Sequence, residues 1–225
     1  MKQIRDTASL LWRFRYHLLC TVIAVALWDT SFIYPFRLFM VVVHEVCHAA
    51  AAMATGGEVL EMKTQWDESG HTLTRGGLFP IISAAGYVGS AVLGALLIYT
   101  GKFPRPQRLV LAIIGTATMG MTMWYTPLGG MDSYLGIFGG LLLLCMAIKS
   151  QRASRAAATW LGIMLCLYSL HDFRTDLWLY PEMTDAGILA RNWGLPILAY
   201  PIALTWVSLS LALMYRALRA VVKDS

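Results

Sequence analysis

The residues with the sharpest chemistry in this chain are two histidines and a glutamate within one apolar stretch. His44, Glu45 and His48 form the pattern HExxH. On a helix, residues four apart lie on one face, so the two imidazoles can bind a single metal ion. Glu45 is placed to hold and deprotonate a metal-bound water. Because the pattern is expected by chance only about 0.002 times in this composition, it favours a zinc (Zn2+) site.

An alternative for these three residues is that they are ordinary polar side chains on an internal helix face. Ionisable groups inside apolar sequence are costly in a bilayer and are usually functional. The metal site is therefore the preferred interpretation. A catalytic zinc keeps three protein ligands and one open position, so a third ligand is expected elsewhere in the chain.

The composition shows what kind of protein must position this site. Of 225 residues, 57% are hydrophobic and 14% are charged, whereas a soluble domain carries about 25% charged residues. This excludes a soluble globule, a disordered tail, a coiled coil and a disulfide-stapled secreted domain. The net charge of +5 comes from small clusters between apolar runs, which is not a nucleic-acid signal.

Seven apolar segments are long enough to be membrane helices, since backbone amides in lipid must be paired internally. They cover residues 16–34, 36–55, 79–100, 108–126, 131–148, 156–171 and 195–217. The sequence therefore predicts an all-α polytopic membrane protein with about six to seven transmembrane helices. Residues 1–225 are expected to form a single integral-membrane domain.

Two longer polar connections interrupt these segments. Residues 56–77 alternate on both sides of a Gly-containing turn, which predicts a β-hairpin directly after the HExxH helix. A free strand edge there could pair with an extended peptide, although the hairpin could equally be a cap at the membrane surface. Residues 172–194 are expected to form a second polar loop.

The basic residues suggest that the first two segments do not both cross the membrane. If all seven segments cross, lysines and arginines divide almost evenly between the two sides. If one segment within residues 16–55 fails to cross, the N-terminal charges join the larger group and a clear positive-inside pattern results. We therefore expect a non-crossing or re-entrant piece in this region.

Further landmarks along the chain make it similar to a known family. They follow the HExxH sequence and are Gly56-Gly57, Gly70-His71-Thr72, Ala84-Ala85-Gly86-Tyr87-Val88-Gly89, Ser169-Leu170-His171-Asp172, Asp176, Thr184-Asp185-Ala186 and Gly194-Leu195-Pro196. The chain resembles the site-2 protease family of intramembrane zinc metallopeptidases, in its compact branch without a PDZ domain. This resemblance covers most of the chain.

The resemblance implies that the third zinc ligand is an aspartate on a later helix. The family's Asn-Pro-x-x-Asp-Gly-like motif is absent, and its nearest imitation is Pro127-Leu128-Gly129-Gly130-Met131-Asp132. Asp172, at the end of an apolar run, is the preferred candidate. Asp176 and Asp132 are the alternatives. Asp185 opens a short predicted helix, which Thr184 or Asp185 could simply cap.

The metal site and the resemblance together imply an intramembrane zinc metalloprotease. It would hydrolyse a peptide bond of a membrane-anchored protein with zinc-activated water and Glu45 as general base. The alternative is a non-catalytic zinc-binding membrane protein with a regulatory or binding role, which the missing motif favours. The expected partners are a membrane-anchored protein substrate and the lipid bilayer, with no nucleic acid. The expected location is the cell membrane, as a multi-pass protein.

Cys47, beside His48, is interpreted as a small packing residue and not as a ligand.

Overall fold

The protein is a bundle of helices with one small sheet. The computed structural model describes the backbone of residues 2–179 and 181–223, and the side chains of residues 14–171 and 181–222. The elements in these ranges, in chain order, are α1 (Lys2–Ala26), α2 (Tyr34–Ala54), β1 (Glu58–Thr64), β2 (Gly70–Arg75), α3 (Phe79–Thr100), α4 (Pro104–Tyr125), α5 (Met131–Lys149), α6 (Gln151–Leu179), α7 (Asp185–Asn192), the 3₁₀ turn η1 (Pro196–Leu198) and α8 (Ala199–Lys223).

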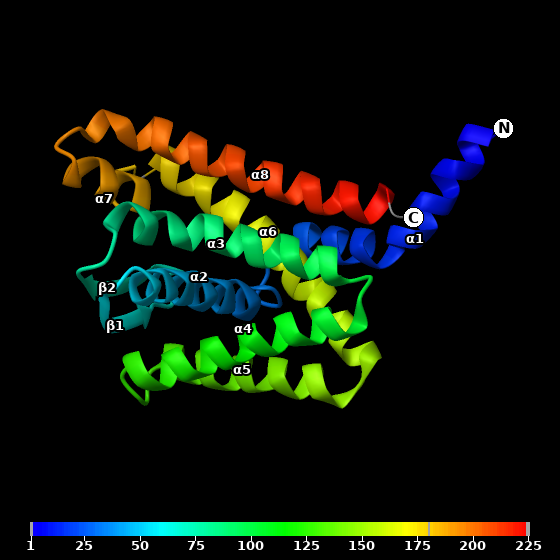
Figure 1. Cartoon of the computed structure of the whole chain (residues 1–225), viewed down its shortest axis with the longest axis horizontal. Helices are drawn as coiled ribbons and strands as arrows, with labels where there is room; N and C mark the ends of the chain where they lie inside the picture. Colours follow the sequence, from blue (N-terminus) through cyan, green and yellow to red (C-terminus); the bar gives the residue numbers. More distant parts are fainter. Residues whose placement is uncertain (1, 180, 224–225) are drawn as a thin grey trace.

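Helix α3 occupies the centre of the bundle. It packs against α2 on one side and against α6 and α8 on the other, while α4 and α5 pair with each other. Figure 1 shows α8 and α4–α5 at opposite sides of the molecule, with α3 and α2 between them. Small residues along α3 allow these close approaches, because a Cβ atom on Gly94 would lie 2.9 Å from the main-chain oxygen of Gly162 in α6. The central helix therefore joins the halves of the bundle.

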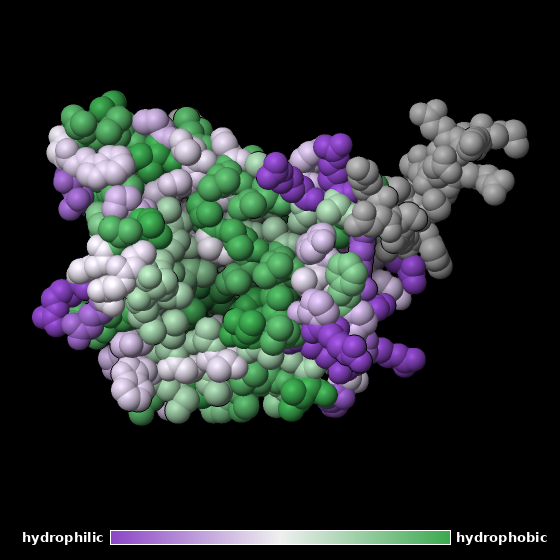
Figure 2. Space-filling view, viewed as in Figure 1, coloured by the Kyte–Doolittle hydropathy of each residue, from purple (hydrophilic) through white to green (hydrophobic). Residues whose placement is uncertain are grey.

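The surface has the character of a membrane protein. Figure 2 shows hydrophobic side chains across the middle of the molecule and hydrophilic ones gathered toward its two ends. Among the described residues, five helical stretches are long and apolar enough to cross a membrane. They lie in α2, α3, α5, the first part of α6, and η1 with α8. The predicted all-α polytopic membrane fold is thus confirmed, and α1 and α4 fall outside this set of five.

The start of the chain keeps the hypothesis of a non-crossing piece open. Within the part of α1 whose side chains the structure describes, the apolar stretch is Phe14–Ala26. In Figure 1, α1 begins at the end of the molecule where α3 is connected to α4. That placement is the one that the hypothesis requires, since it puts the start of α1 toward the same end of the molecule as the connection between α3 and α4. Which segments cross stays a prediction.

The predicted hairpin after the HExxH helix is confirmed. Helix α2 ends in a Schellman arrangement, in which Gly56 has a φ of 80° and the amide of Gly57 donates to the carbonyl of Ala52 at 2.8 Å. Only glycine adopts that left-handed conformation without strain. The chain then turns back into β1, which pairs antiparallel with β2. The C-terminal cap of α2 thereby places the hairpin directly beside the HExxH helix.

The hairpin is held along α2 by apolar and polar contacts. Val59 and Met62 of β1 are buried in one cluster with Val46 and Ala49 of α2. At the turn, the guanidinium of Arg37 pairs with Glu68, and the hydroxyl of Tyr34 donates to the carbonyl of Trp66. These contacts fix the hairpin at both of its ends. It therefore lies against the helix that carries the metal motif.

The polar connection expected at residues 172–194 differs from the prediction. Residues 172–179 continue α6, and residues 185–192 form α7, so most of this stretch is helical. The prediction took Asp172 as the end of a helix because the apolar run stops there. A helix can continue past its apolar part when helix-forming residues such as Arg174 and Leu177 follow, since backbone hydrogen bonding does not depend on hydropathy.

Candidate metal centre

Helix α2 places the two histidines of the motif on one buried face. His44 and His48 are 8% and 6% exposed, and their rings meet edge to face with centroids 4.8 Å apart. Their Nε2 atoms are 3.0 Å apart. The ring of Tyr87 packs edge to face against the ring of His44, with centroids 4.9 Å apart. The i,i+4 spacing thus brings two imidazole nitrogens close together on one face of α2.

The carboxylate that meets these histidines is Asp185 at the start of α7. Its Oδ2 lies 3.2 Å from Nε2 of His44 and 3.1 Å from Nε2 of His48. Among the described residues, His44, His48 and Asp185 form the one group of histidine, cysteine and acidic side chains suited to a metal ion. The sequence analysis named Asp185 only as a possible helix cap.

Thr184, and not Asp185, caps α7. The side-chain oxygen of Thr184 accepts from the amide of Gly187 at 3.0 Å, and its hydroxyl donates to the carbonyl of Pro181 at 3.0 Å. Gly187 in turn packs tightly on this turn, where a Cβ atom would overlap the Pro181 carbonyl. Because Thr184 satisfies the free amide of the first helical turn, the Asp185 carboxylate is left to face the histidines.

The electrostatics of the group keep Asp185 ionised. Burial raises the pKa of its carboxyl, but the nearby His48 and the hydrogen bond to His44 outweigh burial and hold the pKa below its ordinary value. An anionic carboxylate is the form that binds a metal. The position of Asp185 therefore gives it the charge that a ligand needs.

The arrangement of protons also fits a cation between these three side chains. Nδ1 of His48 lies 2.6 Å from the carbonyl oxygen of Ile82 in α3. A carbonyl only accepts, so Nδ1 carries a proton, and in the neutral ring Nε2 then offers a lone pair. That lone pair lies 3.1 Å from the Asp185 carboxylate, so a proton on Nε2 or a metal ion must join these two acceptors.

The donor types are those of a zinc site, and the distances between the donor atoms are close to those of one. A tetrahedral zinc with ligand bonds of about 2.0–2.2 Å holds its ligand atoms about 3.3–3.6 Å apart. The three distances here, 3.0, 3.2 and 3.1 Å, are shorter by a few tenths of an ångström. Two histidines with one carboxylate are a catalytic zinc set that leaves the fourth position open. The residues present therefore fit the metal.

Gly86 of α3 keeps the space at these ligand atoms free. This glycine is buried, and a Cβ atom on it would overlap Nε2 of both His44 and His48. Gly86 therefore packs against α2 directly at His44 and His48. Glycine at this position thus lets α3 approach α2 without filling the centre.

We expect Gly86→Ala to abolish metal binding. The added methyl group would occupy the space between the imidazoles, so zinc per polypeptide should fall from about one to below about 0.1. Gly120→Ala is the matched control, because Gly120 lies in α4 with open space around it. Mass spectrometry of zinc in purified, correctly sized protein makes the comparison. Wild-type zinc content in Gly86→Ala would show that the metal lies elsewhere.

Glu45 lies on the neighbouring face of α2, against the hairpin. It is 4% exposed, and its Oε2 accepts a hydrogen bond of 2.7 Å from the Thr72 hydroxyl. Its other carboxylate oxygen lies toward Gly70, where a Cβ atom would overlap Oε1. The carboxylate predicted to act as general base is therefore enclosed by β2 and held at one oxygen.

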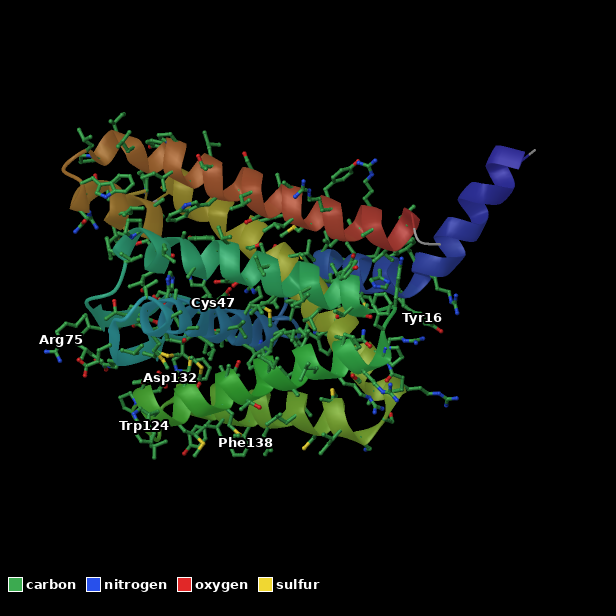
Figure 3. All side chains as sticks on the ribbon, viewed as in Figure 1. Tyr16, Cys47, Arg75, Trp124, Asp132 and Phe138 are labelled. Carbon is green, nitrogen blue, oxygen red and sulfur yellow. The ribbon has the colours of Figure 1, made fainter. Side chains whose placement is uncertain are left out.

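The other predicted ligands have different surroundings. Asp172 and Asp176 lie in α6, but their side chains are outside the described residues, and the assignment of Asp172 stays a prediction. Asp132 accepts from the amides of Thr64 and Ser133, and Figure 3 shows it beside the hairpin at the start of α5. It thus joins the hairpin to α5 and lies outside the group of three.

Cys47 packs against α3 at Gly89. A Cβ atom on Gly89 would lie 3.1 Å from its Sγ, and Figure 3 shows it between the layers of the bundle. It is a free cysteine that fills the α2–α3 contact. This agrees with its interpretation as a packing residue.

Comparison with known families agrees with this geometry. The model of the family described as Peptidase M50B-like matches residues 17–217. The chain belongs to this family. The match confirms the resemblance to site-2 proteases, and the region matched contains His44, His48, Asp185 and the whole hairpin. Searches of curated proteins and of solved structures gave no match. This M50B-like protein is thus an integral membrane protein of a metallopeptidase family.

Proposed function

We propose that this M50B-like protein is an intramembrane zinc metalloprotease that cleaves a membrane-anchored protein in the cell membrane. The single observation that carries the proposal is the convergence of His44, His48 and Asp185, with the buried Glu45 next to His44 in the chain. We propose Asp185 as the third ligand in place of Asp172. Its 3.1 and 3.2 Å contacts to the histidines support this choice.

Different residues of the chain have different roles in the proposed hydrolysis. His44, His48 and Asp185 would hold the zinc, which when bound lowers the pKa of a water and polarises a peptide carbonyl. Glu45 accepts the proton of the attacking water at its carboxylate and returns it to the leaving amine. The Ile82 carbonyl fixes the ring of His48, and so its free nitrogen, toward the centre. Burial of Glu45 keeps its carboxylate away from bulk solvent.

The hairpin is suited to present the substrate. A transmembrane helix hides its carbonyls in hydrogen bonds, so the segment to be cut must become extended. In the two-stranded sheet β1 pairs with β2, and β2 carries exposed residues along its length. The Thr72 side chain of β2 contacts Glu45, and among the described residues the outer edge of β2 pairs with no third strand in this sheet. An extended segment paired with this edge would therefore lie next to the general base.

We expect proline substitutions in β2 to separate substrate pairing from metal binding. Proline removes one backbone donor, so at alternate positions such as His71 and Leu73 it should impair cleavage where the amide faces outward. Zinc content should stay at the wild-type level in these variants, because the ligands lie on α2 and α7. Labelled casein in detergent provides the activity measurement. Equal activity in every proline variant would refute strand pairing.

The proposed function is tested by the new protein ends that the enzyme creates. Membranes from cells that express the wild-type protein and from cells that express Glu45→Gln are compared by mass spectrometry of protein N-termini. We expect new N-termini inside or beside transmembrane segments in the wild-type sample alone. Identical sets of N-termini in the two samples, with zinc bound in both, would instead favour a non-catalytic zinc protein.

A further inference from the structure

We propose that Thr72 of β2 is a positioning residue for Glu45, so that the hairpin takes part in the reaction as well as covering the site. This inference rests on the proposed function and adds a residue to it. The Thr72 hydroxyl oxygen lies 2.7 Å from Oε2 and 3.1 Å from the main-chain oxygen of Glu45. It therefore touches both the carboxylate and the helix backbone that carries it.

The single hydroxyl proton of Thr72 belongs to the carboxylate. A hydroxyl has one proton to donate, and a bond to an ionised oxygen is shorter and stronger than one to a neutral carbonyl. The 2.7 Å contact is the shorter of the two. Thr72 thus occupies Oε2 and limits the rotation of the Glu45 side chain.

Gly70, two residues earlier on β2, leaves the other oxygen free. Any Cβ atom at this position would overlap Oε1 of Glu45 and would lie 2.9 Å from Cγ1 of Val41. The β2 strand therefore lies as close to Glu45 as its backbone allows. Gly70 lies against Oε1 of Glu45, whereas Thr72 donates to Oε2. Oε1 is the oxygen left to accept the proton of the attacking water, while Oε2 is held by Thr72.

The rest of the hairpin keeps Thr72 in place. Its cross-strand partner is Met62, which is 2% exposed and packed with Val46, Ala49 and Ile82. The ion pair of Arg37 with Glu68, at 2.7 Å, ties the turn to the start of α2. Because these contacts anchor the strand on both sides of Thr72, the hydroxyl has a defined position relative to Glu45.

The contact itself is tested by thermal unfolding of four proteins: wild type, Thr72→Val, Glu45→Ala and the double variant. Valine has nearly the shape of threonine but cannot donate. We expect Thr72→Val to lower the melting temperature by about 3 °C or more in the wild-type background. In the Glu45→Ala background the same change should have an effect below about 1 °C. Equal shifts in both backgrounds would overturn the proposal.

The role in the reaction is tested by kinetics on labelled casein. We expect Thr72→Val to lower kcat by about 10- to 100-fold with KM and zinc content nearly unchanged, since a residue that orients a reacting group acts on the chemical step. Thr72→Ser should restore most of kcat because it keeps the hydroxyl. Thr74→Val is the matched control, being the same change two residues along the same face of β2.

The outcomes separate this inference from the proposed function. Thr72→Val with wild-type kcat, beside an inactive Glu45→Gln, would reject the positioning role and leave the protease standing. Equal losses in Thr72→Val and Thr74→Val would also reject it, because both would then reflect the fit of the strand. Wild-type protein no more active than Glu45→Gln would reject the proposed function, and the inference with it.

Discussion

Glu45→Gln is expected to lower the rate of peptide hydrolysis by about 10²- to 10⁴-fold, the range typical of a lost general base. Glutamine has the shape of glutamate and still accepts a hydrogen bond from Thr72, so the packing of α2 on the hairpin should be preserved. Its amide cannot take a proton from water. Initial rates on labelled casein in detergent measure the loss.

Zinc content supplies the control for this variant. Glu45 lies outside the group of His44, His48 and Asp185, so Glu45→Gln should bind as much zinc as the wild type. A variant that loses zinc together with activity would place Glu45 among the ligands. A variant that keeps full activity would remove Glu45 from the mechanism.

Asp185→Asn is expected to weaken zinc binding by more than about 100-fold, beyond the 10- to 100-fold typical of residues that only orient a ligand. The amide oxygen is neutral, so it both coordinates zinc more weakly and leaves the two imidazoles without their anionic partner. Competition with a chromophoric chelator measures the affinity. The N-cap Thr184 is unchanged in this variant, so α7 should remain folded.

Matched variants decide which aspartate is the third ligand. Asp172→Asn and Asp176→Asn should keep zinc affinity within about threefold of the wild type if Asp185 fills the role, because three protein ligands complete a catalytic site. Strong loss in Asp172→Asn with little change in Asp185→Asn would restore the assignment made from the sequence. Asp132→Asn should act on the hairpin–α5 contact and leave zinc affinity unaltered.

The parts of the site that could be predicted from sequence are those set by local spacing. His44 and His48 share a face because a helix repeats every 3.6 residues, and the hairpin follows from alternation around a turn at Asp67 to Gly70. Each of these features depends on residues near one another in the chain.

The third member of the group could not be predicted in this way. Asp185 is 141 residues from His44 in the chain, and its meeting with the histidines depends on how α6, α7 and α3 pack together. Thr184-Asp185 at a helix start has the same sequence signature whether the aspartate caps the helix or leaves it free. The signal that was available is that Thr184 alone can cap α7, so Asp185 is spare. Thr72 was equally hidden, because the register of β2 against α2 follows from packing.

The most direct test of the account is X-ray absorption at the zinc edge of the purified wild-type protein, with zinc per polypeptide measured on the same sample. We predict about one zinc with nitrogen and oxygen neighbours alone at about 2.0–2.2 Å, and an imidazole signal reduced in His44→Ala. A sulfur neighbour at about 2.3 Å would move Cys47 into the centre. No bound zinc after reconstitution would contradict the metal centre and the proposed protease together.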